Sequence, residues 1–406
     1  MGAKANRAFG VEDMGYPEGQ SKQECAKIPQ TATISTQAVA LTDVPHLPDS
    51  AGQTNRMRPE LLPPPLRGPA VWRAGDWGPQ ESYTVYLSDR QLAEIEQAAT
   101  HWLEQGHHLE SLTAGSLHLP GLYAELTQWT RRLLHGEGFV LIRGLPVDRW
   151  SRPVLATAFY GLGCYLGNPR PQNQAGHLLG HVIDKGLDPS DPHVRLYQTH
   201  ERQSFHTDSC DIVGLLCLKQ AKEGGDSALV SSNTIYNEMR KNTPELAAAL
   251  FDPIATDRRG ETPAGEKPYF EIPVFNWHQA EMSTIYQRQY IDSAQRFPQA
   301  MRLTDLHRQA LDTFDALAND SSLHIMMRLQ EGDMQFVHNH NMLHDRTAFT
   351  DWPQPSQRRH LLRLWISSPQ ARALPPVFAQ RYGSVVPGQR GGIDLPRSAW
   401  HAPLNP

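Results

Sequence analysis

The sequence has few cysteines and no long hydrophobic segment. Its 406 residues contain four irregularly spaced cysteines: Cys25, Cys164, Cys210 and Cys217. This pattern argues against a disulfide-stabilised scaffold and a Cys-x-x-Cys zinc site, and it favours reduced thiols in a cytoplasmic protein. No run approaches the roughly 18 apolar residues of a membrane span. The N-terminus lacks the apolar segment of a signal peptide, so neither an anchor nor secretion is expected.

The sequence also has no excess of positive charge. The chain carries 38 lysines and arginines against 43 acidic residues, which gives a formal net charge of −5. No basic stretch indicates binding to nucleic acid or to an anionic membrane, so neither partner is expected. The length allows one large domain or two small ones. A homo-oligomeric assembly is left open by the sequence.

The first 68 residues differ from the rest in composition. They are rich in Ser, Thr, Gln and Pro, poor in large apolar residues, and end in "RPELLPPPLRGP". Because prolines favour extended backbone, we predict a disordered or extended N-terminal arm over residues 1–68. An ordered domain is predicted at 69–385 and a C-terminal tail at 386–406.

Helical patterns begin the ordered region. In residues 86–106 apolar side chains recur at helical spacing, Ser88 is placed to cap the helix, and Gln91 would complete a capping box. The same reasoning predicts further helices at 122–136, 152–167, 233–242 and 302–320.

Short apolar runs typical of strands alternate with these helices. We predict strands at 138–146, 212–221, 226–232, 324–330, 333–344 and 359–367, with an aromatic β-rich stretch at 267–286. The glycine-rich residues 173–186 are interpreted either as a mobile lid or as an ordinary loop. This order favours an α+β domain whose sheets form a sandwich or barrel.

A histidine and an aspartate lie one residue apart in "SFHTDSCD". Because residues i and i+2 of a strand point to the same side, His206 and Asp208 can bind one ion. A third ligand must come from a distant strand. His344 is our choice because it ends the run "FVHNHNMLH", where a strand should emerge into a loop. The other candidates are His338, His340 and His360.

Two histidines and one carboxylate on one side of an octahedral ion leave three positions open. Non-haem Fe(II) oxygenases use this arrangement, since O₂ and a bidentate co-substrate must both reach the metal. An isolated His-x-Asp is weak evidence in a chain with 19 histidines. A structural zinc site is the competing interpretation, although structural zinc usually takes four protein ligands.

Two arginines follow His344 on an apolar strand. Arg359 and Arg363 are four residues apart and share one side of that strand. Their apolar neighbours would bury them, and a buried arginine needs an anionic partner such as a co-substrate carboxylate. Pairing with structural carboxylates, or snorkelling at a strand edge, is an equal alternative.

Five stretches complete the pattern: "GFVLIRGLP", "FHTD", "GGDS", "NHNMLHDRTAF" and "RRHLLRLW". With them, residues 70–380 resemble the taurine dioxygenase-like (TauD/TfdA) family of Fe(II)/2-oxoglutarate-dependent oxygenases, whose relatives include clavaminate synthase. The resemblance implies a double-stranded β-helix, or jelly-roll, core flanked by helices. It also implies a dioxygenase that consumes O₂ and releases succinate and CO₂.

The resemblance also assigns roles to individual residues. Iron binding is implied for His206, Asp208 and His344. Binding of the distal 2-oxoglutarate carboxylate is implied for Arg359 and Ser227, and Arg358 stays open on spacing. Arg363 matches a position that contacts the anionic group of the substrate in some members.

The substrate itself is only broadly indicated. The intact Asp208 favours hydroxylation or desaturation over halogenation, because halogenating members replace this carboxylate. We expect an unactivated C–H bond of a small anionic or zwitterionic organic molecule to react. Side chains expected to face the cavity are Tyr197, Arg202, Gln203 and Phe205.

Two further points stay open. Asn339 and Asp345 are expected to orient the metal-binding histidines, since metal ligands are usually held by outer hydrogen-bond partners. The alternative function is a catalytically inactive jelly-roll module that binds a metal or a small acid.

Overall fold

The computed structural model describes residues 56–188 and 194–406. These residues fall within the unit Thr54–Pro406, which is described by itself. The predicted arm lies outside the described residues up to residue 55. Its last part packs on the domain, because the hydroxyl of Tyr236 donates to the carbonyl of Pro63 and Asn237 accepts from the amide of Leu66.

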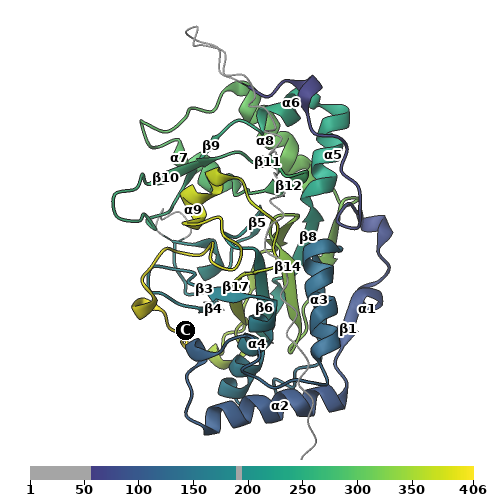
Figure 1. Cartoon of the computed structure of the whole chain (residues 1–406), viewed down its shortest axis with the longest axis vertical. Helices are drawn as coiled ribbons and strands as arrows, with labels where there is room; N and C mark the ends of the chain where they lie inside the picture. The colour runs from purple at the N-terminus through teal and green to yellow at the C-terminus, as the bar shows by residue number, and fades with distance from the viewer. Residues whose placement is uncertain (1–55, 189–193) are drawn as a thin grey trace, which may run out of the picture. The chain divides into compact units, whose positions relative to one another are not determined.

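Two β-sheets form the centre of this unit (Figure 1). The larger sheet runs in the order β1 (Thr84–Tyr86), β2 (Phe139–Arg143), β14 (Met334–His338), β6 (Ile212–Lys219), β17 (His360–Ser367) and β3 (Asn168–Arg170), and β4 (Leu179–Val182) also pairs with β17. The smaller sheet runs in the order β13 (His324–Met327), β8 (Ser227–Ser231), β15 (Met342–Arg346) and β5 (Gln203–His206). All pairs are antiparallel apart from β1 with β2.

The two sheets pack against each other through a shared apolar cluster. Leu361 and Trp365 of the larger sheet belong to it, together with Leu229 and Met342 of the smaller sheet. Because side chains alternate along a strand, the neighbours of these residues point to the outer faces of the sheets. The site residues described below lie on the inner faces.

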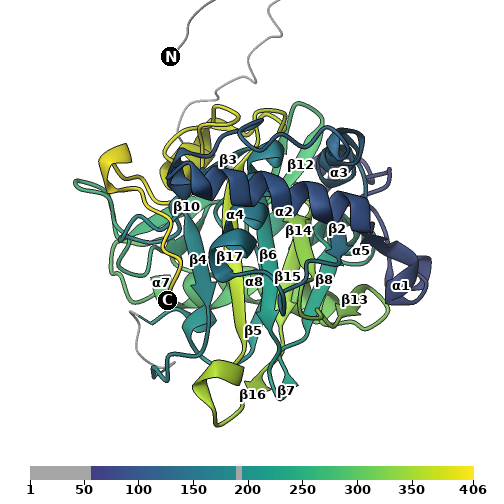
Figure 2. The same cartoon turned by 90° about the horizontal axis from the view of Figure 1, so that it is seen from below.

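Helices cover both outer faces. Helices α2 (Asp89–Glu104), α3 (Tyr123–His135) and α4 (Arg152–Leu166) share a cluster with Leu362 and Leu364 of the larger sheet, and Figure 2 shows α2 lying across its strands. Helices α5 (Ser232–Asn242), α6 (Pro244–Ala249) and α8 (Asp305–Ala318) pack on the smaller sheet through Val230 and Leu343. The larger sheet therefore has helices on one face and the smaller sheet on the other, which explains why all eight residues of β17 are buried.

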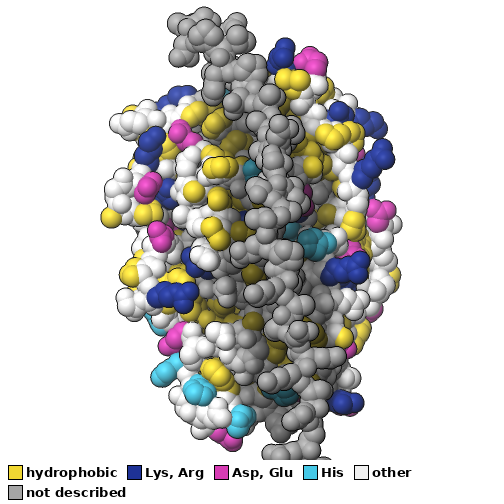
Figure 3. Space-filling model, in the orientation of Figure 1, with side chains coloured by type: hydrophobic (Ala, Val, Ile, Leu, Met, Phe, Trp, Pro, Cys, Tyr) yellow, Lys and Arg dark blue, Asp and Glu magenta, His cyan; other side chains and the backbone are white. Residues whose placement is uncertain are grey.

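The remaining elements surround this core. They are helices α1 (Gln80–Tyr83), α7 (Arg288–Ala294) and α9 (Ala379–Tyr382), and the strand pairs β9 (Ile254–Asp257) with β10 (Tyr269–Ile272), β11 (Phe275–His278) with β12 (Glu281–Thr284), and β7 (Glu223–Gly224) with β16 (Phe349–Thr350). On the face drawn in Figure 3, visible Lys and Arg side chains are interspersed with acidic and apolar ones.

Most predicted helices and strands are confirmed. Ser88 caps α2 by accepting from the amide of Gln91, whose side chain accepts from the Ser88 amide in return. The prediction of one strand over residues 333–344 is wrong, because the chain turns at residues 339–341. β14 therefore belongs to the larger sheet and β15 to the smaller one.

The glycine-rich stretch 173–186 is not a lid throughout. Its residues Leu179–Val182 form β4, which is buried and pairs with Leu361–Leu364 of β17. The predicted tail 386–406 also packs on the domain: Arg390 is fully buried, and its guanidinium donates to Asp211. The boundaries at 68 and 385 stay predictions.

Candidate metal centre

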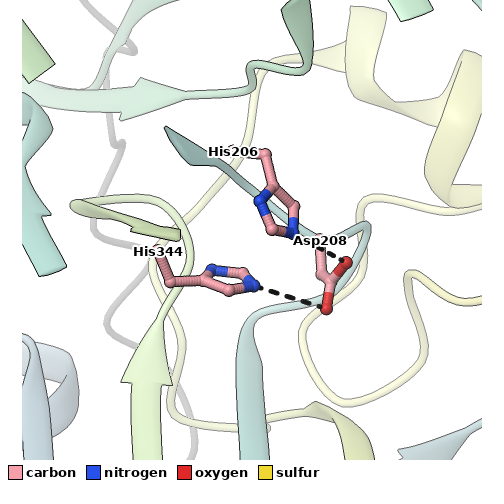
Figure 4. A group of neighbouring side chains, drawn as sticks. All are labelled: His206, Asp208 and His344. Carbon is pink, nitrogen blue, oxygen red and sulfur yellow. Dashed lines mark ion pairs between the residues drawn. The ribbon is translucent and has the colours of Figure 1, made fainter. Parts of the chain in front are cut away.

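His206, Asp208 and His344 come together between the two sheets (Figure 4). One ligand atom from each lies within 4.8 Å of the other two. The Nε2 atoms of His206 and His344 are 4.0 and 3.8 Å from the two carboxylate oxygens of Asp208. Within the described ranges, no other group of three such side chains has this spacing.

Strand pairing produces this arrangement. His206 ends β5 and lies directly opposite His344 on β15, so the two rings lie with centroids 4.1 Å apart and planes tilted by 50°. Asp208 follows β5 after one residue, and its side chain turns back toward both rings, as Figure 4 shows. The sequence predicted this convergence, although the ligand role itself stays a prediction.

The alternative histidines are placed elsewhere. The Nε2 of His340 lies 2.9 Å from a carboxylate oxygen of Asp211, and His338 is buried beside His340. His360 lies 2.8 Å from a ring nitrogen of His181. None of the three belongs to the group formed with Asp208.

The charges of the three side chains suit a divalent cation. Burial alone would raise the pKa of Asp208, but Arg363, the two histidines and the Trp365 N–H together lower it to about 2. Burial, and then the proximity of His206, lower the pKa of His344 to about 3. Burial likewise lowers the pKa of His206. At neutral pH the site therefore offers two neutral imidazoles and one carboxylate.

Hydrogen bonds hold Asp208 and His206 in place, whereas Nδ1 of His344 has no hydrogen-bond partner among the described residues. The indole N–H of Trp365 donates to Oδ2 of Asp208 at 2.8 Å, and His206 Nδ1 lies 2.8 Å from the carbonyl of Ser204. Asn339 contacts the site, as expected, but it accepts from the backbone amide of Asp208 at 3.1 Å rather than orienting a histidine.

A second buried cation lines a different hollow from the pocket of His206 and Asp208. The side chain of Arg359 is almost fully buried, one of its terminal nitrogens lacks a hydrogen-bond partner, and no described carboxylate lies within ion-pair distance. Burial lowers the pKa of this guanidinium to about 10. Arg358 is exposed and donates to the carbonyls of Trp352 and Pro353. A co-substrate carboxylate would supply the anion that Arg359 lacks.

Ser227 and Arg346 lie on neighbouring strands, and Arg346 is close to Arg359. Ser227 is buried at the start of β8, directly opposite Arg346 on β15. Sequence reasoning missed Arg346, although it stands two residues after His344. Its buried guanidinium and that of Arg359 lie over the ring of Phe349, at 4.8 and 5.2 Å from the centroid. Burial, and then Arg359, lower the pKa of Arg346 to about 9.

A pocket opens next to the metal ligands, and only some of the residues expected to contact the substrate line it. Tyr197, Gln203 and Arg363 line it together with His206 and Asp208. The guanidinium of Arg363 lies 4.5 Å from the centroid of the Tyr197 ring and 3.7 Å from an oxygen of Asp208.

Arg202 and Phe205 do not line this pocket. Arg202 pairs with Asp345 at 2.6 Å, so neither of these residues serves the role expected of it. Phe205 points to the opposite face of β5 and packs beside His324 and the cluster under α5 and α8. Ordinary alternation accounts for Phe205, which precedes His206, and a bulge in β5 displaces Arg202 from that alternation.

Comparison with known proteins identifies the fold and the family. The model of the family described as "Taurine catabolism dioxygenase TauD, TfdA family" matches residues 106–365. The chain belongs to this family. The FR-33289 synthase of Streptomyces rubellomurinus is 32% identical over 320 residues, which cover 78% of this chain and 94% of that protein.

A further relative and a solved structure are also similar to this chain. The taurine hydroxylase-like protein SAT17 of Stachybotrys chartarum is 29% identical over 74% of this chain and 79% of its own length. A solved structure of asparagine oxygenase with Fe(II), 3-hydroxyasparagine and succinate covers 70% of this chain and 93% of that one, with a TM-score of 0.56 and 18% identity. The expected double-stranded β-helix is confirmed.

Family membership establishes the reaction type. The protein is a non-haem iron dioxygenase that uses Fe(II), 2-oxoglutarate and O₂ on a small molecule. In the described part of the chain, no helix has both the length and the apolar character needed to cross a membrane.

Proposed function

We propose that this oxygenase hydroxylates or desaturates an unactivated C–H bond of a small anionic or zwitterionic molecule. Fe(II) would be held by His206, Asp208 and His344. 2-Oxoglutarate would be held through its distal carboxylate by Arg359 and Ser227. The observation that carries this proposal is the convergence of two neutral imidazoles and one carboxylate, together with a buried guanidinium that has no carboxylate partner among the described residues.

The metal site and its surroundings fit the iron and its co-substrate. Three protein donors on one side of an ion leave positions for 2-oxoglutarate and O₂, and iron supplies the oxidation chemistry when bound. The chain contributes the geometry. Trp365 and Asn339 hold Asp208, while Arg359 and Arg346 present positive charge where a carboxylate would bind.

Arg363 supports an anionic substrate. Its buried guanidinium lines the pocket beside Asp208 and stacks on Tyr197. Gln172 accepts from its Nε at 2.7 Å and thereby fixes its direction. A substrate anion in this pocket would meet a positioned, desolvated cation, which favours charge-assisted hydrogen bonding.

An anaerobic titration tests the proposed function. Apo-protein receives Fe(II) and then 2-oxoglutarate, absorption is followed in the visible range, and O₂ is then admitted with a succinate assay. We expect a charge-transfer band that requires both additions, followed by succinate. Iron binding without band or succinate would instead favour the inactive binding module.

A further inference from the structure

Three arginines from distant parts of the chain line the same pocket as His206 and Asp208. Arg195 precedes β5, Arg258 follows β9, and Arg381 lies in α9. Arg258 is 4% exposed, and the side chains of the other two are 13% and 8% exposed. The Nε of Arg381 donates to the hydroxyl of Ser209 at 2.9 Å, which places it one residue from Asp208.

These arginines have too few counter-charges. Glu261 pairs with Arg195 and also lies 3.5 Å from Arg381, so one carboxylate serves two cations. Arg258 donates to two backbone carbonyls, and its nearest carboxylate is the exposed Glu266 at 3.8 Å. Burial lowers the pKa of Arg381, and burial followed by the nearby Arg381 lowers that of Arg258 to about 10.

The other carboxylates of the pocket are already engaged. Asp257 pairs with Arg296 at 3.1 Å and accepts from the hydroxyl of Ser293. Asp208 faces Arg363 and the proposed iron. The three buried cations of the arginine group therefore share one buried carboxylate, Glu261, and one exposed carboxylate, Glu266. Arginine does not relieve such a surplus of positive charge by losing a proton.

Arg258 and Arg381 lie between the metal pocket and a second hollow, whose wall contains Glu261, Glu266 and Asp394. Glu261 and Glu266 are the two carboxylates already counted above. Among the described residues that line it, the metal pocket itself supplies no further carboxylate that is free to pair with the arginine group.

We propose that Arg195, Arg258 and Arg381 bind a dianionic phosphoryl group of the substrate, either a phosphate monoester or a phosphonate. This inference rests on the proposed function and narrows its substrate class. The substrate would reach from the arginine group to the metal, with its reactive C–H near His206 and Asp208.

The charge and shape of the group select this chemistry. A phosphate monoester carries about −1.5 to −2 at neutral pH and offers three acceptor oxygens. Three guanidiniums that line one pocket match it in charge and offer planar, bidentate donors. A lone carboxylate or sulfonate would leave one buried cation uncompensated.

Calorimetric titration of the full-length, metal-free protein tests the proposal. The probes are methyl phosphate and methylphosphonate, titrated at a pH above the second pKa of both so that each is a dianion, and compared with methanesulfonate and acetate as monoanions. We expect both dianions to bind at one site, about tenfold or more tightly than either monoanion. Repeating the titration with saturating 2-oxoglutarate separates this site from the one beside Arg359.

Variants locate the binding. Arg381→Gln and Arg258→Gln should each weaken methyl phosphate binding about tenfold or more. Arg131→Gln, on the exposed face of α3, removes the same charge away from the pocket and should leave binding unchanged. Arg258 also supports its loop, so circular dichroism must show a folded protein. Arg381→Lys, which keeps the charge but loses the planar fork, should give an intermediate loss.

Each outcome is decisive. Equal binding of dianions and monoanions, or phosphate binding unaffected by Arg381→Gln and Arg258→Gln, would overturn the substrate class. The charge-transfer titration tests the proposed function separately. If the charge-transfer band and succinate appear but either of these two binding results is also obtained, only the phosphoryl-group inference is refuted. A panel of phosphate monoesters and phosphonates, scored for stimulated succinate release, would then show which of the two sources the pocket accepts.

Discussion

The indole N–H of Trp365 donates a hydrogen bond to Oδ2 of Asp208 at 2.8 Å. Both residues are buried, and they come from different parts of the chain: β17 and the turn after β5. This bond fixes the carboxylate in the direction of the two histidines. It also helps to keep Asp208 ionised, because a donor to a carboxylate favours the charged form.

Removing this donor should weaken the metal site. Trp365→Phe keeps most of the apolar volume but frees Asp208 to rotate, so we expect Fe(II) affinity to fall by about 10- to 100-fold. Anaerobic metal titration measures this. Trp102→Phe is the matched control, because the Trp102 N–H has no hydrogen-bond partner. Equal affinity in Trp365→Phe and the wild type would contradict the prediction.

The third ligand can be tested directly. His344→Ala should abolish stoichiometric Fe(II) binding, since two donors cannot hold the ion in the proposed way. His360→Ala, which lies on β17 outside the group, should retain it. Full iron occupancy in His344→Ala, measured by metal analysis after gel filtration, would assign the third ligand to another side chain.

Arg359 should govern 2-oxoglutarate binding without affecting iron. Arg359→Gln removes the buried guanidinium, and we expect the affinity for 2-oxoglutarate to drop by about 30-fold or more. The midpoint of the charge-transfer titration measures it. Arg358→Gln is the adjacent exposed control and should match the wild type. The reverse pattern would transfer the role to Arg358.

Metal affinity should depend little on pH near neutrality. The pKa of His344 is lowered to about 3, and that of His206 is lowered as well, so protons compete with the metal only in acid. Between pH 7.5 and 6 we expect less than about a twofold change. Histidines with an ordinary pKa of about 6.5 would each cost about fourfold over this range. Competition with a coloured chelator can measure the difference.

The C-terminal residues should be needed for stability. Arg390 is fully buried, and its Nε donates to Asp211 at 2.9 Å, where His340 also binds. Arg390→Met leaves that carboxylate poorly compensated, which should lower the free energy of unfolding by about 3–5 kcal/mol. Urea denaturation measures this. Exposed Arg397→Met should cost less than about 0.5 kcal/mol, and similar losses in both variants would refute the argument.

Local pattern was sufficient for much of the fold. The periodic apolar residues and the Ser88 cap predicted α2 correctly, because a helix forms from contacts three and four residues apart. The His-x-Asp pair and a late histidine were likewise enough to nominate three side chains that the structure brings within 4.8 Å. The reason for choosing His344 was wrong, because it lies in the middle of β15 and not at a strand end.

Only the tertiary structure determined which side chains reach the pocket and which distant residues come together there. Ordinary alternation turns Phe205, the neighbour of His206, away from the pocket, whereas the bulge in β5 brings Gln203 rather than Arg202 into it. The arginine group at Arg195, Arg258 and Arg381 has no shared spacing or motif. Such long-range contacts depend on which elements pack together, and one-dimensional periodicity does not encode that packing.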